Sequence, residues 1–117
     1  MAAAGPLTGV RVLDFSTVGP AARSARWLAD YGADVVKIGA PARLGAVQIE
    51  PVFYAYSAHR GMRRIRLDLK ADEGKAAFLR LAETADVVIE SFRPGVVDRL
   101  GIGYGAVKEV NPGIVYC

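Results

Sequence analysis

Short apolar runs alternate with segments of helical periodicity along the whole chain, and this alternation constrains the fold more than any other feature. Strands are expected at residues 10–15, 34–38, 65–69, 87–90 and 114–116. Helices are expected at residues 20–31, 72–85, 94–100 and 104–110, with a further short one near 52–58. The strand–helix–strand spacing is about what a parallel crossover requires. The pattern therefore predicts an α/β fold with a Rossmann-like open parallel sheet and flanking helices.

Length and composition restrict the class of protein. A chain of 117 residues has room for one compact unit, and its 52% hydrophobic and 23% charged residues are interleaved as in globular proteins. No apolar run approaches the roughly 18 residues of a membrane span, and residues 1–7 lack the features of a signal peptide. A lone cysteine without a Cys/His cluster predicts no metal site and fits a reducing compartment. We therefore expect a cytoplasmic protein without a membrane partner.

The basic residues give a net charge of +3 and gather densely at one place, Arg60, Arg63, Arg64 and Arg66. A phosphorylated small ligand explains this cluster as well as nucleic acid does. The aromatic residues that interleave with basic ones in single-strand binders are missing, so no nucleic-acid partner is expected.

Ligands of an open parallel sheet bind outside the carboxyl ends of its strands, which directs attention to residues 16–20, 39–44 and 91–95. A dinucleotide site needs three spaced glycines in the first of these turns and an acidic residue after the second strand. The first turn holds only Gly19, and Gly39 stands where the acid is required. The sequence therefore argues against NAD.

The segment from Ser91 to Gly95 is more informative. Arg93 precedes Pro94, which is suited to the first turn of a helix, so a guanidinium group is expected beside free backbone N–H groups. Such a place binds anions, and Arg99 is near enough along the helix to reach the same ligand. The alternative is that both arginines are solvated surface residues. Arg63, at the start of a strand, is a further candidate for the ligand edge.

Other candidates have a structural interpretation beside the chemical one. His59 is expected on the surface, without a partner, and Trp27 and Tyr31 are expected in the core. Asp14 and Glu90 end apolar strands, where a carboxylate serves as a general acid or base or caps a turn. Arg64 and Arg66 share one strand face and are expected to be exposed. Cys117 is expected in a buried strand.

Five stretches, PLTGVRVLDF, LADYGADVVKI, RGMRRIRLDLK, ADVVIESFRPGVVDRLGIGY and NPGIVYC, occur in an order that resembles the family III CoA-transferases. These include formyl-CoA and carnitine CoA-transferases and a close relative, α-methylacyl-CoA racemase. The resemblance runs from Pro6 to Cys117. Gly39 and Ala40 depart from it, because the family often has an acidic and then a basic residue there.

The resemblance implies that residues 1–117 are the N-terminal, CoA-binding portion of a Rossmann-like large domain that is split in sequence. Ser91, Phe92, Arg93 and Val96 match the loop and helix start along CoA, and Arg99 matches an arginine that contacts it. Arg63 matches a basic position before the third strand. The implied partners are acyl-CoA, a carboxylic acid and a second subunit in an intertwined homodimer.

Three functions remain open from the sequence. The chain is part of a transferase that moves CoA between carboxylic acids, part of a racemase that moves the α-proton of an acyl-CoA, or a non-catalytic nucleotide-binding or assembly module. The resemblance implies that the catalytic aspartate of a transferase, or the His/Asp pair of a racemase, lies beyond Cys117. No residue of this chain is therefore assigned a catalytic role.

Overall fold

Five parallel strands form one open sheet at the centre of the computed structural model, which describes residues 4–17, 19–41 and 59–117. The strand order is β3-β2-β1-β4-β5, as in Rossmann folds, so the predicted fold class is confirmed. The strands are β1 (Arg11–Asp14), β2 (Asp34–Gly39), β3 (Arg63–Arg66), β4 (Val87–Ile89) and β5 (Val115–Tyr116). The helices are α1 (Gly19–Asp30), α2 (Asp72–Ala82), α3 (Val96–Leu100) and α4 (Tyr104–Val110).

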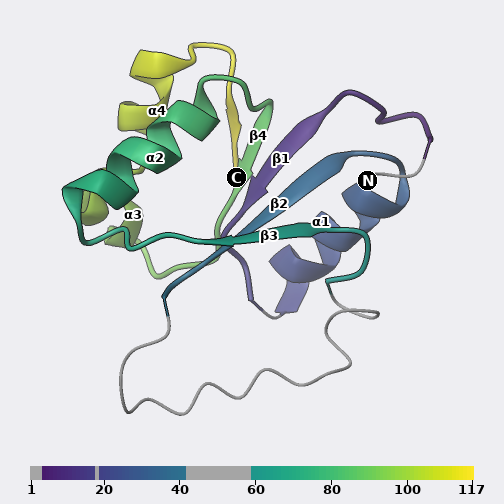
Figure 1. Ribbon diagram of the computed structural model, residues 1–117, viewed down its shortest axis with the longest axis horizontal. Helices are drawn as coiled ribbons and strands as arrows, with labels where there is room; N and C mark the ends of the chain where they lie inside the picture. Colours follow the sequence, from purple (N-terminus) through teal and green to yellow (C-terminus); the bar gives the residue numbers. More distant parts are fainter. Residues whose placement is uncertain (1–3, 18, 42–58) are drawn as a thin grey trace.

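The helices form two layers, one on each face of the sheet. Figure 1 shows α1 on one side and α2, α3 and α4 together on the other. Each layer buries its own apolar cluster: Val12 and Val35 pack with α1, whereas Leu13 and Val36 pack with Phe78 of α2. Because side chains alternate across a strand, neighbouring residues of β1 and β2 contribute to different layers. Within the described ranges, no helix is long and apolar enough to cross a membrane.

Helix α1 buries small side chains, and this overturns the expected position of its aromatic residues. Ala25 and Ala29 face the sheet with at most 5% of their surface exposed. Trp27, on the opposite face of α1, and Tyr31, directly after the helix, are 55% and 58% exposed, so placing them in the core was wrong. A helix whose inner face is alanine approaches the sheet closely, and the bulkier face is left outside.

Several boundaries differ from the expected ones, and one position was wrong. Strand β3 ends at Arg66 and α2 at Ala82, each three residues earlier than expected, whereas α4 has the expected bounds. Cys117 is exposed rather than buried, although its N–H and C=O extend the hydrogen bonding between β5 and β4. The short helix expected at 52–58 lies outside the described residues.

Two glycines in helices provide a test of this packing. A Cβ on Gly74 of α2 would overlap the backbone carbonyl of Asp68, whereas a Cβ on Gly105 of α4 meets no atom within 4 Å. Gly74→Ala should lower the free energy of unfolding by about 1 to 3 kcal/mol because the backbone must shift. Gly105→Ala, the matched control, should raise it by about 0.5 to 1 kcal/mol through helix propensity. Urea denaturation measures both, and equal effects would contradict the close approach at Gly74.

Candidate functional site

A pocket of about 530 Å³ opens at the carboxyl edge of the sheet. It receives residues from the ends of four strands and from the end of α3, which are Phe15, Thr17, Ile38, Gly39, Ala40, Pro41, Leu67, Asp68, Leu69, Lys70, Phe92 and Leu100. Strand β1 lies between β2 and β4. The chain adds β2 and β3 on one side of β1 and then β4 and β5 on its other side, so the order of strands reverses at β1. Crevices of this kind hold the ligands of open α/β sheets.

An exposed aromatic ring lies on one wall of the pocket. Phe92 is 41% exposed, and its ring centroid lies 6.1 Å from that of Phe15. Phe15 in turn packs 5.0 Å from the buried Phe78. The backbone N–H of Phe92 donates to the Glu90 carboxylate at 2.7 Å, which fixes the start of the loop. Phe92 therefore presents a supported apolar surface to the pocket.

The loop after β4 turns sharply before α3. Pro94 and Gly95 occupy its centre, Gly95 has a φ of 86°, and the N–H of Val96 donates to the carbonyl of Arg93 at 3.2 Å. This geometry is typical of a type II turn, which needs glycine at its third position. Helix α3 consequently begins at Val96, whereas the sequence had predicted a start at Pro94.

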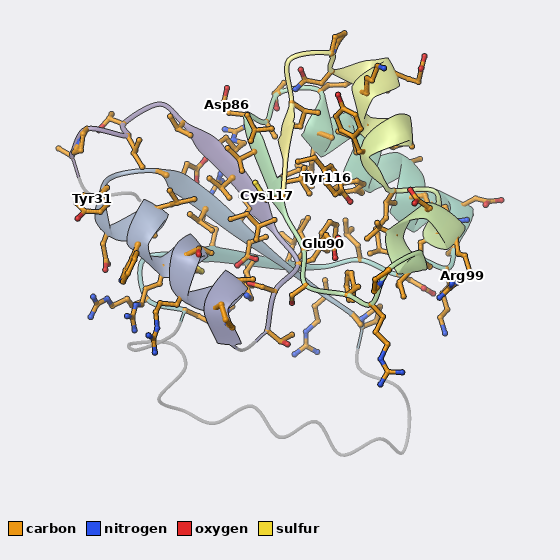
Figure 2. All side chains as sticks on the ribbon, turned by 180° about the vertical axis from the view of Figure 1, so that it is seen from behind. Tyr31, Asp86, Glu90, Arg99, Tyr116 and Cys117 are labelled. Carbon is orange, nitrogen blue, oxygen red and sulfur yellow. The ribbon has the colours of Figure 1, made fainter. Side chains whose placement is uncertain are left out.

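Arg99 folds back toward this loop. A Cβ placed on Gly95 would lie 3.2 Å from Nη1 of Arg99, so the guanidinium group lies against the glycine. The backbone N–H of Arg99 also donates to the carbonyl of Gly95 at 3.1 Å. Figure 2 shows Arg99 on the outside of the layer that contains α3, with Glu90 at the end of β4.

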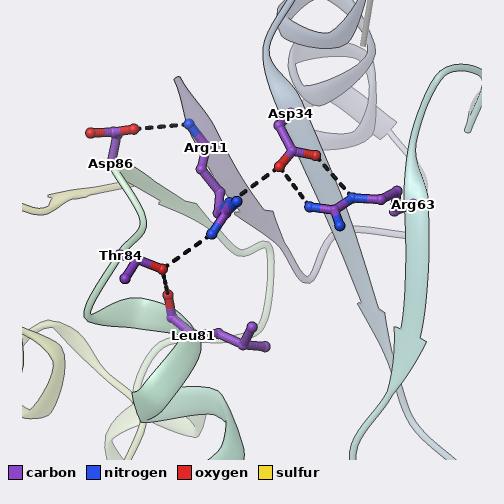
Figure 3. Close-up of polar contacts among 6 residues, drawn as sticks. All are labelled: Arg11, Asp34, Arg63, Leu81, Thr84 and Asp86. Atoms are coloured by element: carbon purple, nitrogen blue, oxygen red, sulfur yellow. Dashed lines mark hydrogen bonds and ion pairs between the residues drawn. The ribbon is translucent and has the colours of Figure 1, made fainter. Parts of the chain in front are cut away.

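The six residues selected from the sequence fall into two groups. Ser91, Phe92, Arg93, Val96 and Arg99 all belong to the loop and helix after β4, and Phe92 lines the pocket itself. Arg63 is elsewhere: it is the first residue of β3, at the amino edge of the sheet, and forms two hydrogen bonds to Asp34, at 2.6 and 3.0 Å. Figure 3 shows Arg63 and Arg11 sharing the Asp34 carboxylate.

The arginines of the two edges differ in their partners. Although partial burial opposes ionisation of Asp34, hydrogen bonds from Arg63 and Arg11 hold the pKa of this carboxyl below its ordinary value. Arg60 is paired with Asp30 at 2.8 Å. Across the described ranges, no carboxylate lies within ion-pair distance of Arg93 or Arg99. Among the described residues, Arg93 and Arg99 thus keep positive charges without an ion-pair partner, while the pocket itself is lined by both Lys70 and Asp68.

Sequence reasoning missed part of the pocket. Leu67 to Lys70 follow β3 at its carboxyl end and form one wall, and Leu100 closes α3 against the same space. Ligands bind beyond the carboxyl ends of parallel strands, and this holds for the loop after β3 as it does for the loop after β4. The alternation of residues 65–69 predicted instead that the strand continued through them, so the loop after β3 was not among the expected ligand segments.

A buried polar cluster lies beside the pocket, on the α1 face of the sheet. Asp14 is fully buried at the end of β1 and pairs with Lys37 of β2 at 2.9 Å. The other carboxylate oxygen accepts the backbone N–H of Ser16 at 2.8 Å and its hydroxyl at 2.5 Å. The Nζ of Lys37 also lies 3.3 Å from the Ser16 hydroxyl. Asp14 therefore holds the turn after β1, which agrees with the interpretation of Asp14 as a residue that caps a turn.

His59 belongs to this cluster and is 6% exposed, so its expected surface position was wrong. Its Nε2 lies 3.4 Å from the carbonyl oxygen of Thr17, and its Nδ1 lies 2.6 Å from a guanidinium nitrogen of Arg64. Burial is the main cause that lowers the pKa of His59, and the charge of Lys37 adds to it. Arg64 and Arg66 are exposed, as expected.

The cluster contains serine, lysine, aspartate and histidine, yet it is not arranged for nucleophilic catalysis. Ser16 and Asp14 are both fully buried, and the Ser16 hydroxyl donates to the carboxylate rather than to a base. A substrate has no access to either group. Among the residues that the structure describes, no group of three His, Cys, Asp or Glu side chains could hold a metal.

Known proteins share both the sequence and the fold. The model of CoA-transferase family III matches residues 7–117. A probable fatty acyl-CoA transferase of Mycobacterium tuberculosis, Rv3272, is 41% identical over 95% of this chain and 30% of its own length. A succinyl-CoA:mesaconate CoA-transferase of Haloarcula hispanica is 38% identical over 96% of this chain and 31% of its own. A crystal structure of a Rv3272 mutant superposes with a TM-score of 0.84, at 40% identity, over 97% of this chain and 32% of that one. The chain thus spans about a third of the length of these relatives.

The buried ion pair provides a test of the cluster. Lys37→Met leaves the fully buried Asp14 without its cation and should lower the free energy of unfolding by about 3 to 5 kcal/mol. The double variant Asp14→Asn, Lys37→Met removes both charges and keeps an acceptor for Ser16, so it should recover most of this loss. Chemical denaturation measures both variants. A loss below about 1 kcal/mol in the single variant would contradict a buried, charged pair.

Proposed function

Because the chain belongs to CoA-transferase family III, we propose that it supplies the coenzyme-A-binding part of an enzyme that moves CoA between carboxylic acids. The observation that carries the proposal is the combination of a largely apolar pocket at the carboxyl edge with two arginines, Arg93 and Arg99, that have no ion-pair partner among the described residues and lie in the loop and helix after β4. CoA offers a flat adenine ring, a 3′-phosphate and a pyrophosphate, which require these two kinds of surface.

The apolar part of the site suits the adenine ring. Phe92 is exposed and supported from behind by Phe15, so a planar base can stack on it or against it. Stacking of a nucleobase on an aromatic side chain contributes about 1 to 3 kcal/mol. Leu67 and Leu100 line the same space and extend its apolar surface.

The charged part of the site suits the phosphates. Arg93 and Arg99 come from the same segment as Phe92, and Lys70 lies on the pocket wall that follows β3. Guanidinium groups bind phosphate oxygens through short, charge-assisted hydrogen bonds. Ser91 and Val96 border the same loop and are proposed to contact CoA along its length. Arg63 lies at the opposite edge, beside Asp34, and has no part in this proposal.

Transfer between carboxylic acids is favoured over the two alternatives. The relatives reported above are named as transferases, one for fatty acyl-CoA and one for succinyl-CoA and mesaconate. A racemase and a non-catalytic module have no comparable support. Within the chain, the carboxylate nearest the pocket along β1, Asp14, is buried and ion-paired, so it is not the group that attacks a thioester. We propose that the residues described here bind and orient CoA.

The proposal has further consequences for the intact protein. We propose that it takes an acyl-CoA and a free carboxylic acid as substrates, and that it functions as a homodimer in the cytoplasm. The family resemblance supports the substrates and the homodimer, and the single cysteine fits the reducing conditions of the cytoplasm.

Binding of CoA fragments tests which end of the molecule this site holds. In the intact protein, 3′,5′-ADP should compete with CoA because it carries the adenine ring and charged phosphates. Pantetheine lacks both and should compete at least tenfold more weakly. Isothermal titration or displacement of a fluorescent CoA analogue measures the two constants. Stronger competition by pantetheine would place the adenosine end elsewhere.

Replacement of Arg99 tests the phosphate contact. Arg99→Ala in the intact protein should weaken CoA binding by about 1.5 to 3 kcal/mol, the amount typical of a lost hydrogen bond to a charged group. Arg23→Ala is the matched control, because Arg23 is an exposed arginine of α1 on the other face of the sheet. Its dissociation constant should stay that of the parent protein. Equal CoA dissociation constants for Arg99→Ala and the parent would contradict the proposed contact between Arg99 and a CoA phosphate.

A further inference from the structure

Glu90 joins the sheet to the loop that borders the pocket. It directly follows β4, and its backbone N–H donates to the carbonyl of Cys117 at 3.0 Å. The residue before it, Ile89, accepts the N–H of Phe15 at 2.9 Å, so the chain is held on both sides up to the end of β4. The side chain of Glu90 therefore projects from a well-anchored backbone.

The carboxylate of Glu90 turns forward onto the loop. Its Oε2 accepts the backbone N–H of Phe92 at 2.7 Å, the short distance that is typical of a charge-assisted hydrogen bond. The ring centroids of Phe92 and Phe15 lie 6.1 Å apart, and both residues line the pocket. Phe92 is thus held at two points, through its backbone by Glu90 and through its ring by Phe15.

The surroundings of Glu90 distinguish this role from two others. Within the described ranges, no basic side chain lies within ion-pair distance of its carboxylate, so the group does not anchor a cation. A general acid or base must reach the substrate, but Glu90 does not line the pocket, whereas Phe92 does. Glu90 is thus placed to act on the pocket wall rather than on the ligand.

We propose that Glu90 is a positioning residue for the ligand pocket: its carboxylate holds the backbone of Phe92 so that the ring stays in the pocket wall. A wall that is ordered in advance spares the ligand the entropic cost of ordering it. Without the hydrogen bond, only the molecules with the ring in place bind at full strength, and the dissociation constant rises in proportion. The identity of the ligand as CoA rests on the proposed function, but the hold of Glu90 on the loop does not.

Two substitutions at this position separate the hydrogen bond from the charge. Glu90→Gln and Glu90→Met both remove the negative charge and nearly keep the length of the side chain. Glutamine retains an oxygen that accepts the N–H of Phe92, whereas the thioether of methionine is a weak acceptor. Glu90→Gln is therefore the matched control, and the difference between the two variants reports the hydrogen bond. If Glu90→Met does not fold, Glu90→Ala takes its place.

Hydrogen exchange without ligand tests the hold on the loop. In the intact protein, mass spectrometry of a peptide that contains the Phe92 amide measures its exchange rate. This rate should rise about tenfold in Glu90→Met, a factor typical of one lost hydrogen bond, and stay near that of the parent in Glu90→Gln. An unchanged rate in Glu90→Met would overturn the proposal. Equal acceleration in peptides of α1, on the other face of the sheet, would show a general loss of stability and would also overturn it.

A double-variant cycle tests the effect on the ligand. Glu90→Met should raise the CoA dissociation constant about tenfold, within the range that stacking on an aromatic ring contributes, whereas Glu90→Gln should change it by less than about twofold. In the Phe92→Ala background, Glu90→Met should have no further effect, because the ring that it positions is gone. No rise in the parent, or an equal rise in both backgrounds, would overturn the proposal. If Phe92→Ala binds CoA as tightly as the parent, the proposed function fails at its adenine contact, and hydrogen exchange still decides whether Glu90 holds the loop.

Discussion

Burial of β1 on both faces is the constraint on which the rest of the structure depends. Val12 and Leu13 are fully buried, and they point to opposite sides of the sheet. A strand of this kind needs a helical layer on each side, as parallel sheets generally do. Helix α1 covers one face and α2, α3 and α4 cover the other. Since β1 also pairs with both β2 and β4, the chain leaves its carboxyl end at the centre of the sheet, where the pocket opens.

The polar cluster shows how the same strand ends. Asp14 continues the α1-facing row of β1 after Val12, so a carboxylate stands where an apolar side chain is expected. Its desolvation is offset by the cation of Lys37 and by two hydrogen bonds from Ser16. An ion pair of this kind adds little net stability compared with an apolar pair, but it fixes the direction in which the chain turns. The residues after β1 form one wall of the pocket, so the direction of this turn sets the position of that wall.

The sequence was informative where a signal is local, and it failed where the deciding partner is distant along the chain. Helix α4 was bounded correctly because Asn111 and Pro112 end it. The sheet was predicted because each strand carries its own apolar run. His59 was misplaced because its partner Thr17 is 42 positions away and the contact forms only in the fold. Trp27 was misplaced because apolar periodicity does not reveal which face of a helix is buried when the other face is alanine.

The two edges of the sheet differ more in the partners of their arginines than in the number of their arginines. The densest basic stretch of the sequence begins at Arg60, yet Arg60 and Arg63 are each bound to a carboxylate, on Asp30 and Asp34. A phosphate would have to compete with those carboxylates. Arg99 has no such competitor among the described residues, and its guanidinium group lies against Gly95, in the turn between Phe92 of the pocket wall and α3. We therefore propose that the sparse pair, Arg93 and Arg99, binds the anion rather than the dense cluster, because the free energy of binding depends on the interactions that each cation must give up.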